Sequence, residues 1–350
     1  MGAPIYPTRA QVRPVNPVVQ GMINALANDP DDFIAHTFPM RQAPRSVVNG
    51  ELRIHTSGTI FTVDPRDMFG SVDSDGYWAP KSAPSESIGV RPGNVVYQCA
   101  RYGRDALVDL WTAGESEMPV NIDQVEMAAV LAFLRIKREE RFASFVGTAG
   151  NWSNSITLGA GDEFGTASGG DVEANNSSNP IGVLKDAKEK ILDWGRKMNY
   201  LLIPRSTARA LQKHAGILEF LPTNERRITL TPNRLRSVLA AELEIPEANI
   251  HFGVARRNTA SDDLPINLAD IFGDTMWMGY VDPNPTVSGN VDTGDMRFSA
   301  TAGVRIEAMP FTPDVIEDKK KAAESQRIWH AETFKPVMPE LGCPIFNTIG

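Results

Sequence analysis

The residue types that most often carry out chemistry are few in this chain, and they are widely spaced. Its five histidines show no His-x-His, His-x-x-x-His or Glu-x-x-His spacing, which is the pattern of many metal sites. They are His36, His55, His214, His251 and His330. Isolated histidines are usually structural or exposed, so the sequence predicts no metal site.

The two cysteines, Cys99 and Cys343, lie far apart in the sequence, and neither has a histidine nearby. Two such cysteines cannot build a disulfide framework or a metal knuckle, which makes a reducing compartment the default expectation. The G-x-S-x-G elbow of many serine hydrolases is also absent. We therefore expect no catalytic residues.

Motifs that hold phosphate groups are absent too, since no G-x-x-x-x-G-K-[ST] or G-x-G-x-x-G run occurs. Residues 165–170 are rich in glycine, but they lack a lysine and a preceding apolar strand. The acidic pairs Asp31-Asp32 and Asp262-Asp263 are loop features, and a glycosidase needs its carboxylates in an oriented cleft. The sequence thus predicts no cofactor and disfavours an enzyme.

The charge balance disfavours a protein that grips nucleic acid. The chain has 35 basic and 43 acidic residues, for a formal net charge of -8, and it shows no basic stripe. No apolar run approaches the roughly 18 residues that span a bilayer. The N-terminus lacks the charged and apolar regions of a secretory signal. We expect a soluble protein that is made and used in the cytosol.

Two segments are unusual for a compact domain. Residues 1–48 contain seven prolines, which favour extended backbone, and the only helix expected there is a short one at residues 18–26. Such a segment suits an arm that lies on a neighbouring subunit. Residues 64–93 are mostly Pro, Gly, Ser and Asp, and they connect strands expected at residues 52–63 and 94–100. This pattern indicates a protruding two-stranded loop.

A long helix is expected over residues 122–146, because Asn121 and Gln124 can form a capping box and no Gly or Pro interrupts the run. About 25 residues give a helix roughly 37 Å long. Its first half is apolar nearly all round, whereas residues 135–141 are charged on most faces. The pattern is typical of a structural spine.

The rest of the chain reads as an α+β domain with flanking segments. Residues 147–178 are rich in Gly, Asn and Ser, which predicts a linker or surface loop. Helices are expected to begin at Asn179-Pro180, at Ser206 and at Thr231-Pro232, and a further helix at residues 316–331. Strands are expected at residues 200–203, 250–255, 275–281 and 297–309. The tail, residues 334–349, is apolar and contains prolines.

Several local phrases, taken in order, resemble those of the major capsid proteins of tailed bacteriophages, which have the Hong Kong 97-like fold. They are LAFLRIKREE at residues 131–140, NPI at 179–181, NYLLIP at 199–204, ALQKH at 210–214 and MWMGYV at 276–281. None of them is a catalytic motif, so the resemblance rests on their order, and it covers nearly the whole chain.

The resemblance implies an α+β chain with four parts. They are an N-terminal arm (residues 1–48), an extended loop with flanking strands (49–108), a peripheral domain with the spine helix (109–178 and 311–350), and an axial domain (179–310). It also implies a late structural protein that self-assembles from pentamers and hexamers into an icosahedral viral head.

The implied shell encloses double-stranded DNA without binding it specifically. It is part of the virion, it assembles in the host cytoplasm, and no membrane is involved. Only about 48 residues precede the first strand, too few for a fused scaffolding segment, so a separate scaffolding protein is expected. A portal is a further expected partner, and the resemblance leaves a decoration protein open.

Candidate residues at contacts between copies are Tyr77, Trp78, Lys81, Arg138 and Arg141. The two aromatic residues need a partner surface, although they could instead fold back onto their own subunit. Some relatives join a loop lysine to a neighbour's asparagine. Lys81 and Asn347 are candidates for that crosslink, the alternative being that Lys81 is an ordinary exposed lysine.

Two other functions stay open at this point. One is the shell of a bacterial nanocompartment, which has the same fold and encloses enzyme cargo instead of DNA. The other is a hydrolase or transferase whose site is assembled from distant residues. Isolated particles that hold DNA would favour the viral shell, and a monomer with a deep polar cleft would favour the enzyme.

Overall fold

The computed structural model describes residues 33–43, 45–48, 51–63, 92–109, 122–168, 171–222, 229–259, 267–283, 288–290, 295–297, 300–318 and 323–350. The strands are β1 (Met40–Gln42), β2 (Arg45–Val48), β3 (Glu51–Ile54), β4 (Ser57–Val63), β5 (Pro92–Gln98), β6 (Ala100–Asp109), β7 (Ile156–Thr157), β8 (Gly165–Ser168), β9 (Asp171–Ala174), β10 (Tyr200–Pro204), β11 (Ile250–Gly253), β12 (Arg256–Asn258), β13 (Leu268–Asp270), β14 (Met276–Gly279), β15 (Ser288–Asn290), β16 (Asp295–Arg297), β17 (Gly303–Asp318), β18 (Ala323–Pro336) and β19 (Gly342–Phe346).

The α-helices are α4 (Ile122–Gly147), α5 (Pro180–Leu192), α6 (Arg205–Lys213), α7 (Ala215–Leu218) and α8 (Pro232–Leu243). Short 3₁₀ turns are η2 (Ala149–Asn151), η3 (Glu247–Asn249) and η4 (Pro339–Leu341). The long helix expected from the sequence is confirmed as α4. Among the described helices, none combines the length and the apolar character needed to cross a bilayer.

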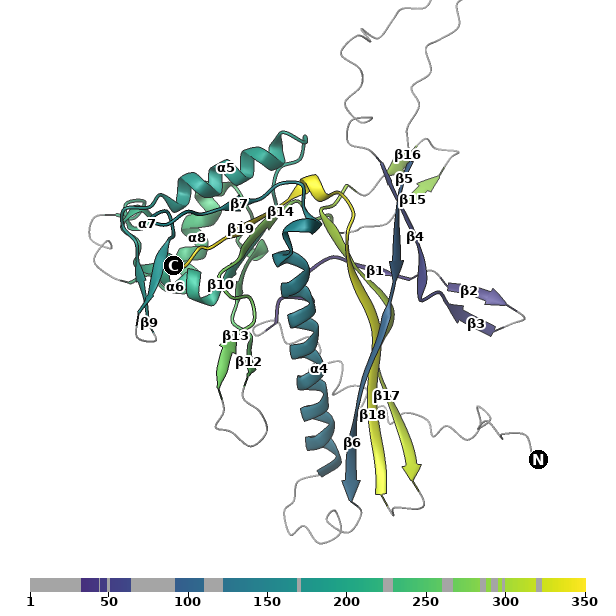
Figure 1. The fold of residues 1–350 in the computed structure, drawn as a ribbon. Coiled ribbons are helices and arrows are strands. Elements are labelled where there is room, and N and C mark those ends of the chain that lie inside the picture. Colours follow the sequence, from purple (N-terminus) through teal and green to yellow (C-terminus); the bar gives the residue numbers. More distant parts are fainter. Residues whose placement is uncertain are drawn as a thin grey trace, which may run out of the picture.

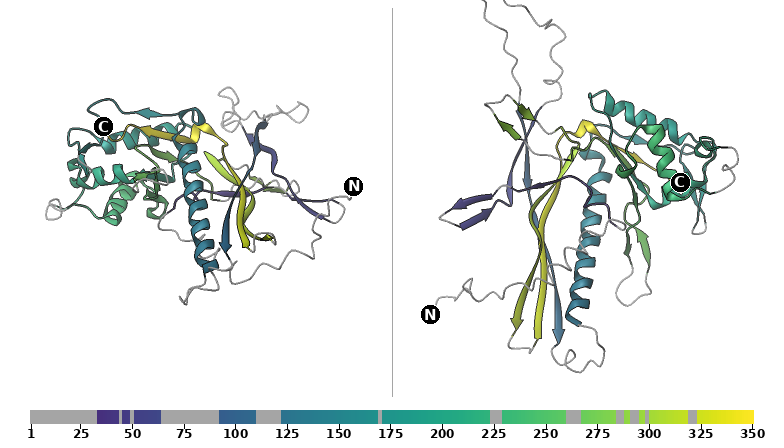
Figure 2. Two further views of the ribbon diagram at one scale, coloured as in Figure 1. Left: turned by 60° about the horizontal axis from the view of Figure 1, so that its bottom comes forward. Right: turned by 180° about the vertical axis from the view of Figure 1, so that it is seen from behind.

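One sheet has four strands in the order β1-β17-β18-β6, and α4 stands beside it (Figure 1). β17 and β18 form a long antiparallel pair that runs from Gly303 opposite Pro336 to Asp318 opposite Ala323. β6 is antiparallel to β18, and the short β1 is parallel to β17. The same three long strands lie next to α4 when the chain is seen from behind (Figure 2).

The helix expected at residues 316–331 is wrong for the part that the structure describes, because residues 316–318 end β17 and residues 323–331 form most of β18. Its charged residues and alanines favour a helix by composition. Ile328, however, pairs with both Pro313 of β17 and Arg104 of β6, and it is fully buried. Pairing on two sides and burial therefore outweigh the local preference.

The strands expected at residues 52–63 and 94–100 are confirmed as β3, β4 and β5. β4 and β5 form an antiparallel ribbon from Ser57 opposite Gln98 to Val63 opposite Pro92. The loop between them, residues 64–91, lies outside the described residues, as does the helix expected at residues 18–26.

A second sheet has five strands in the order β11-β10-β14-β19-β7. Its strand β10 is buried along its whole length, as its run of apolar residues predicts. Helices α5 and α6 pack against this sheet, and α8 packs against both helices. Figure 1 shows the helices gathered around these strands at the end of the molecule away from the long β17–β18 pair.

Two of the predicted helix starts are confirmed by their caps. The side chain of Asn179 accepts a hydrogen bond from the backbone N–H of Gly182 at 3.0 Å, and proline follows at the first position of α5. Thr231 caps α8 in the same way through the N–H of Arg234. Ser206 as a cap is wrong, because α6 already begins at Arg205 and the hydroxyl of Ser206 donates to the carbonyl of Gly273.

The region expected to be a linker, residues 147–178, is structured in its described part. It contains η2, β7 and the hairpin β8–β9. Trp152 and Phe164 are both buried, and the indole of Trp152 donates to the carbonyl of Val146 at 3.0 Å. Single large apolar residues between glycines and serines anchor this region, and a composition average does not register them.

The tail also takes part in the second sheet. β19 lies between β14 and β7, with Met278 opposite Cys343 and Ile345 opposite Ile156. The sequence interpretation grouped residues 311–350 with the spine helix, whereas residues 342–346 pair with strands of the five-stranded sheet.

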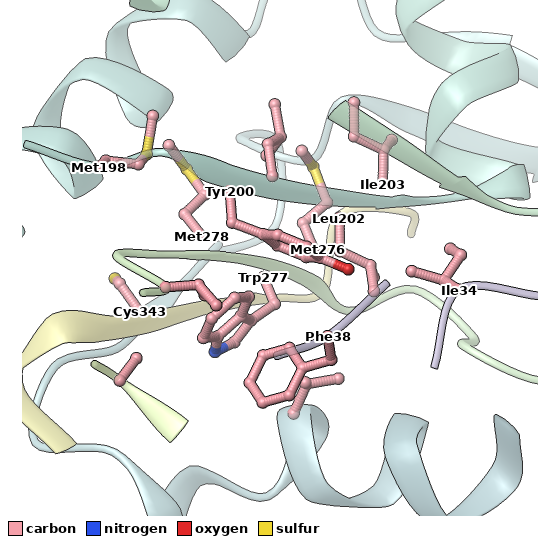
Figure 3. Packing of buried hydrophobic residues seen from close by; sticks show 14 of the residues in the cluster. Ile34, Phe38, Met198, Tyr200, Leu202, Ile203, Met276, Trp277, Met278 and Cys343 are labelled. Atoms are coloured by element: carbon pink, nitrogen blue, oxygen red, sulfur yellow. The ribbon is translucent and has the colours of Figure 1, made fainter. Parts of the chain in front are cut away.

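One continuous apolar core joins the two sheets and the C-terminal half of α4. Phe38 lies at its centre, although it comes from the proline-rich N-terminal region. Its ring lies 5.1 Å from that of Phe142 on α4, and 6.0 Å from those of Tyr200 and Trp277 in the five-stranded sheet. Figure 3 shows Phe38 beside Trp277, in the space between the sheet and the helix.

Candidate functional site

The candidate contact residues fall into two groups. Tyr77, Trp78 and Lys81 lie outside the described residues. Arg138 and Arg141 lie on α4, on the side that faces β18. Asn347, the proposed partner of Lys81, lies in the exposed turn that follows β19. Among the candidates that the structure describes, Arg138 and Arg141 lie together.

Both arginines bind the same carboxylate inside the chain. The Nε atom of Arg138 lies 2.9 and 3.1 Å from the two oxygens of Glu332, and Nη2 of Arg141 lies 2.8 Å from Oε1. Arg138 is 7% exposed and Glu332 is 1% exposed. The guanidinium of Arg138 also stacks on Phe311, and that of Arg141 stacks on Tyr102. This geometry locks the helix onto the sheet.

His330 completes this group from the same strand. Nε2 of His330 lies 2.8 Å from Nη2 of Arg141 and 3.3 Å from Oε1 of Glu332, so this ring nitrogen sits between a guanidinium and a carboxylate. Burial lowers the pKa of His330, against the opposing effect of Glu332. Burial alone would raise the pKa of Glu332, but His330, Arg138 and Arg141 outweigh it and hold that pKa below its usual value.

Further charged groups extend this contact into a buried layer between α4 and the sheet. We call the charge layer the set Arg138, Glu139, Arg141, Arg305, Glu307, His330 and Glu332. Glu307 is the weaker link, since its Oε2 lies 3.9 Å from both Arg138 and Arg305. A buried ionic group of this kind fixes one register of helix on sheet more than it adds stability.

Glu139, on the other side of the layer, holds the N-terminal region. Its two carboxylate oxygens accept the backbone N–H groups of Ile34 and Ala35, at 2.7 and 2.9 Å. The guanidinium of Arg305 contacts the carbonyl of Ala35 at 3.4 Å. Glu139 is fully buried, and burial raises its pKa to about 7 against the opposing effect of the two N–H groups.

Residues 33–43, which we call the anchor segment, therefore lie on their own chain. The hydroxyl of Thr37 is hydrogen-bonded to that of Tyr200 at 2.8 Å, and β1 adds to the edge of β17. The expectation that an arm of residues 1–48 lies on a neighbour does not hold for this segment. Residues 1–32 lie outside the described residues.

The sequence reading missed Glu139, His330 and Glu332. A signal was present, because Arg138 and Arg141 are one helical turn apart while His330 and Glu332 are two residues apart. In a strand, that spacing puts both side chains on one face. Because residues 316–331 were expected to be helical, the sequence did not show that His330 and Glu332 share one face of a strand and could face the two arginines of α4.

No chemistry beyond binding emerges from the described groups. Across the described ranges, no three side chains of His, Cys, Asp or Glu gather as the ligands of a metal would. Cys99 and Cys343 are both buried, and burial raises the pKa of each thiol to about 11. A thiol with so high a pKa is a poor nucleophile at neutral pH. The ion pairs of the charge layer join α4 to the sheet.

The sequence matches no protein-family model and no curated protein. The fold, in contrast, is similar to solved structures over most of the chain. A phage-related protein from Bordetella bronchiseptica RB50 is 18% identical, and the similarity covers 97% of this chain and 98% of that one, with a TM-score of 0.63.

Two assembled particles give weaker matches. A virus-like particle from Pyrococcus furiosus is 9% identical over 93% of this chain and 97% of its own, with a TM-score of 0.53. The capsid of the cyanophage P-SCSP1u is 10% identical over 91% and 89%, with a TM-score of 0.50. The chain therefore has a mixed α/β fold of the kind found in phage capsid structures.

Proposed function

We propose that this chain is the major capsid protein of a tailed bacteriophage, and that its copies assemble into a closed icosahedral shell around double-stranded DNA. One observation carries the proposal: the fold is similar to a virus-like particle and to a phage capsid over more than 90% of the chain, and not in one domain alone. These neighbours are structural proteins, which points away from an enzyme.

The architecture we propose is the Hong Kong 97-like one. The four-stranded sheet and α4 would form the peripheral domain, the five-stranded sheet with α5, α6 and α8 the axial domain, and the ribbon β4–β5 the base of the extended loop. Because residues 342–346 pair within the five-stranded sheet, we assign them to the axial domain. The arm would then consist of the residues before the anchor segment.

Contacts between copies are proposed for the loop residues Tyr77, Trp78 and Lys81. The shell would be built from pentamers and hexamers, with a separate scaffolding protein and a portal as partners and with the host cytoplasm as the site of assembly. Arg138 would act indirectly, because its buried contact with Glu332 fixes the shape of the surface that α4 presents. Arg141 shares that contact and is also partly exposed beside it, where it could meet a neighbouring copy.

The test is the behaviour of the purified full-length chain at increasing concentration. We expect closed particles in negative-stain microscopy and a fast-sedimenting species in the ultracentrifuge, in equilibrium with free subunits. Particles that carry nuclease-protected DNA when isolated from infected cells would support the viral shell. A chain that stays monomeric under all conditions would contradict the proposal.

The nanocompartment shell is the less favoured reading, because the matched structures include a phage capsid. The same isolation distinguishes the two. Particles that enclose a protein cargo and no nucleic acid would replace the viral shell with the nanocompartment.

A further inference from the structure

The C-terminal half of α4 has a surface depression on each of its two sides. Each depression has a volume of about 310 Å³. Ser144 and Thr148 line both of them, since the helix forms the ridge between. One depression lies toward Arg257 and Phe272, and the other lies toward Tyr102 and the end of β18. The pair therefore offers an internal comparison within one helix.

The two depressions differ in charge. The first contains Glu140 and Arg257, whose charged atoms lie 3.7 Å apart, so its charges balance. The second contains Arg141 and Lys335, and no carboxylate lines it. Arg141 is paired with Glu332, which lies beneath the depression, whereas Lys335 has no acidic partner among the described residues. The second depression thus carries an excess positive charge.

Hydrogen-bond donors accompany that charge. Lys335 supplies the available charged donor, since Nη2 of Arg141 is already bonded to Glu332. Side chains with hydroxyl groups, Tyr102, Ser144 and Thr333, line the same depression. A carboxylate accepts several hydrogen bonds at once, and a bond between charged partners is about twice as strong as a neutral one. The second depression is chemically suited to a carboxylate.

We propose that the depression formed by Tyr102, Arg141, Ser144, Thr333 and Lys335 binds an acidic side chain of a second copy of this chain. This inference rests on the proposed shell function and deepens it by assigning a contact site. Charge complementarity supports a second copy as the occupant, because each chain has 43 acidic against 35 basic residues. Nucleic acid is a poorer occupant, because it binds along extended basic surfaces that contact many phosphates. This depression is small and, among the described residues that line it, offers a single unpaired cation.

The test compares three variants of the full-length chain with the wild type. Lys335→Gln removes the excess charge, Lys335→Arg keeps it, and Arg257→Gln removes a cation from the depression with balanced charges. The readout is the concentration at which half of the chain sediments as particles, with circular dichroism of the free subunits as a check on folding.

We expect Lys335→Gln to raise the concentration at which half of the chain sediments as particles by roughly tenfold. This is the effect of losing one charged hydrogen bond per contact. Lys335→Arg should restore it to within about twofold of the wild type, and Arg257→Gln should leave it within the same range because its exposed ion pair contributes little. Higher salt should narrow the difference between Lys335→Gln and the wild type.

Equal assembly of Lys335→Gln and the wild type would overturn the inference and leave the shell function standing. The inference would also be overturned if Arg257→Gln raised the half-assembly concentration as much as Lys335→Gln does, because the effect would then not be specific to the second depression. Normal particles of Lys335→Gln that hold less DNA would replace the second copy with nucleic acid. A wild type that forms no particles would overturn the shell function and this contact with it.

Discussion

The long helix α4 is held in two different ways along its length. Its C-terminal part inserts Phe142, Phe145 and Val146 into the main core, where both sheets and the anchor segment meet. Its earlier part contacts a small separate cluster, made of Met127, Val130, Leu131, Leu134, Phe311 and Ile328. The charge layer lies between the two.

This difference teaches that one continuous helix can belong to two regions of unequal stability. Apolar burial is the dominant stabilising term, and the main core has far more of it than the small cluster. A buried ionic layer adds register more than stability. Local opening should therefore begin at the small cluster, while the C-terminal half of α4 stays protected.

The largest effect should come from Phe38→Ala in the main core. Phe38 is 1% exposed and contacts aromatic rings from α4, β10, β14 and β18. Removing it leaves a cavity that these elements cannot all close, so the free energy of unfolding should fall by about 3–5 kcal/mol in denaturant titration.

Phe133→Ala is the matched control, because Phe133 is a half-buried ring beside the small cluster. Its loss should destabilise the subunit clearly less than that of Phe38. Equal losses in the two variants would mean that the two regions do not differ in stability as described.

A smaller but still large effect is expected for Glu332→Ala in the charge layer. The change leaves Arg138 and Arg141 buried without their shared carboxylate, and breaking such a pair from one side is destabilising by about 3 kcal/mol. Chemical denaturation of the free subunit measures it.

An exposed ion pair on the same strand provides the comparison. Arg327 binds Asp105 through two hydrogen bonds, and both side chains are more than 40% exposed. Arg327→Ala should therefore change the free energy of unfolding by less than about 1 kcal/mol. If Arg327→Ala lowered the free energy of unfolding as much as Glu332→Ala, burial would not explain the stabilising effect of the charge layer.

The last effect is a pH dependence at Glu139, whose change per pH unit is smaller than the effect of either core or charge-layer substitution. Its pKa is about 7 in the folded chain, against 4.5 for an ordinary glutamate, so the folded state binds the proton more tightly than the unfolded state does. The free energy of unfolding should consequently fall as pH rises from 4.5 to 7, by at most about 1.4 kcal/mol per pH unit from this group. Glu139→Gln should lack this contribution.

The difference between the two unfolding curves isolates Glu139, because His36, Arg138 and Arg305 nearby are unchanged in both proteins. We expect the advantage of the wild type over Glu139→Gln to shrink steadily across that pH range. Parallel curves over the same range would show that the carboxyl titrates normally in the folded chain.

Local signals were sufficient for much of the fold. The caps Asn179 and Thr231, the uninterrupted run of α4 and the apolar strand β10 each combine a pattern with a physical cause that acts within a few residues. The errors lie where distant partners decide. Residues 323–331 form a strand because β6 and β17 lie on either side, and neither partner is visible from the local composition.

The candidate site was predicted only in part for the same reason. Arg138 and Arg141 were singled out for their charge on a spine helix, but their partners Glu332 and His330 lie about 190 residues away. The anchor segment was read as reaching a neighbour because prolines exclude long helices. Nothing in its own residues indicates that Glu139 and the core would hold it.

The place of β19 in its sheet has a consequence for synthesis of the subunit. Residues 342–346 are inserted between β14 and β7, and β7 pairs with no other strand of this sheet. While the ribosome is still making earlier residues, the sheet stays open and β7 has no partner. Interrupted chains that stop before residue 342 would lack the strand that joins β14 to β7, and their five-stranded sheet would stay unfinished.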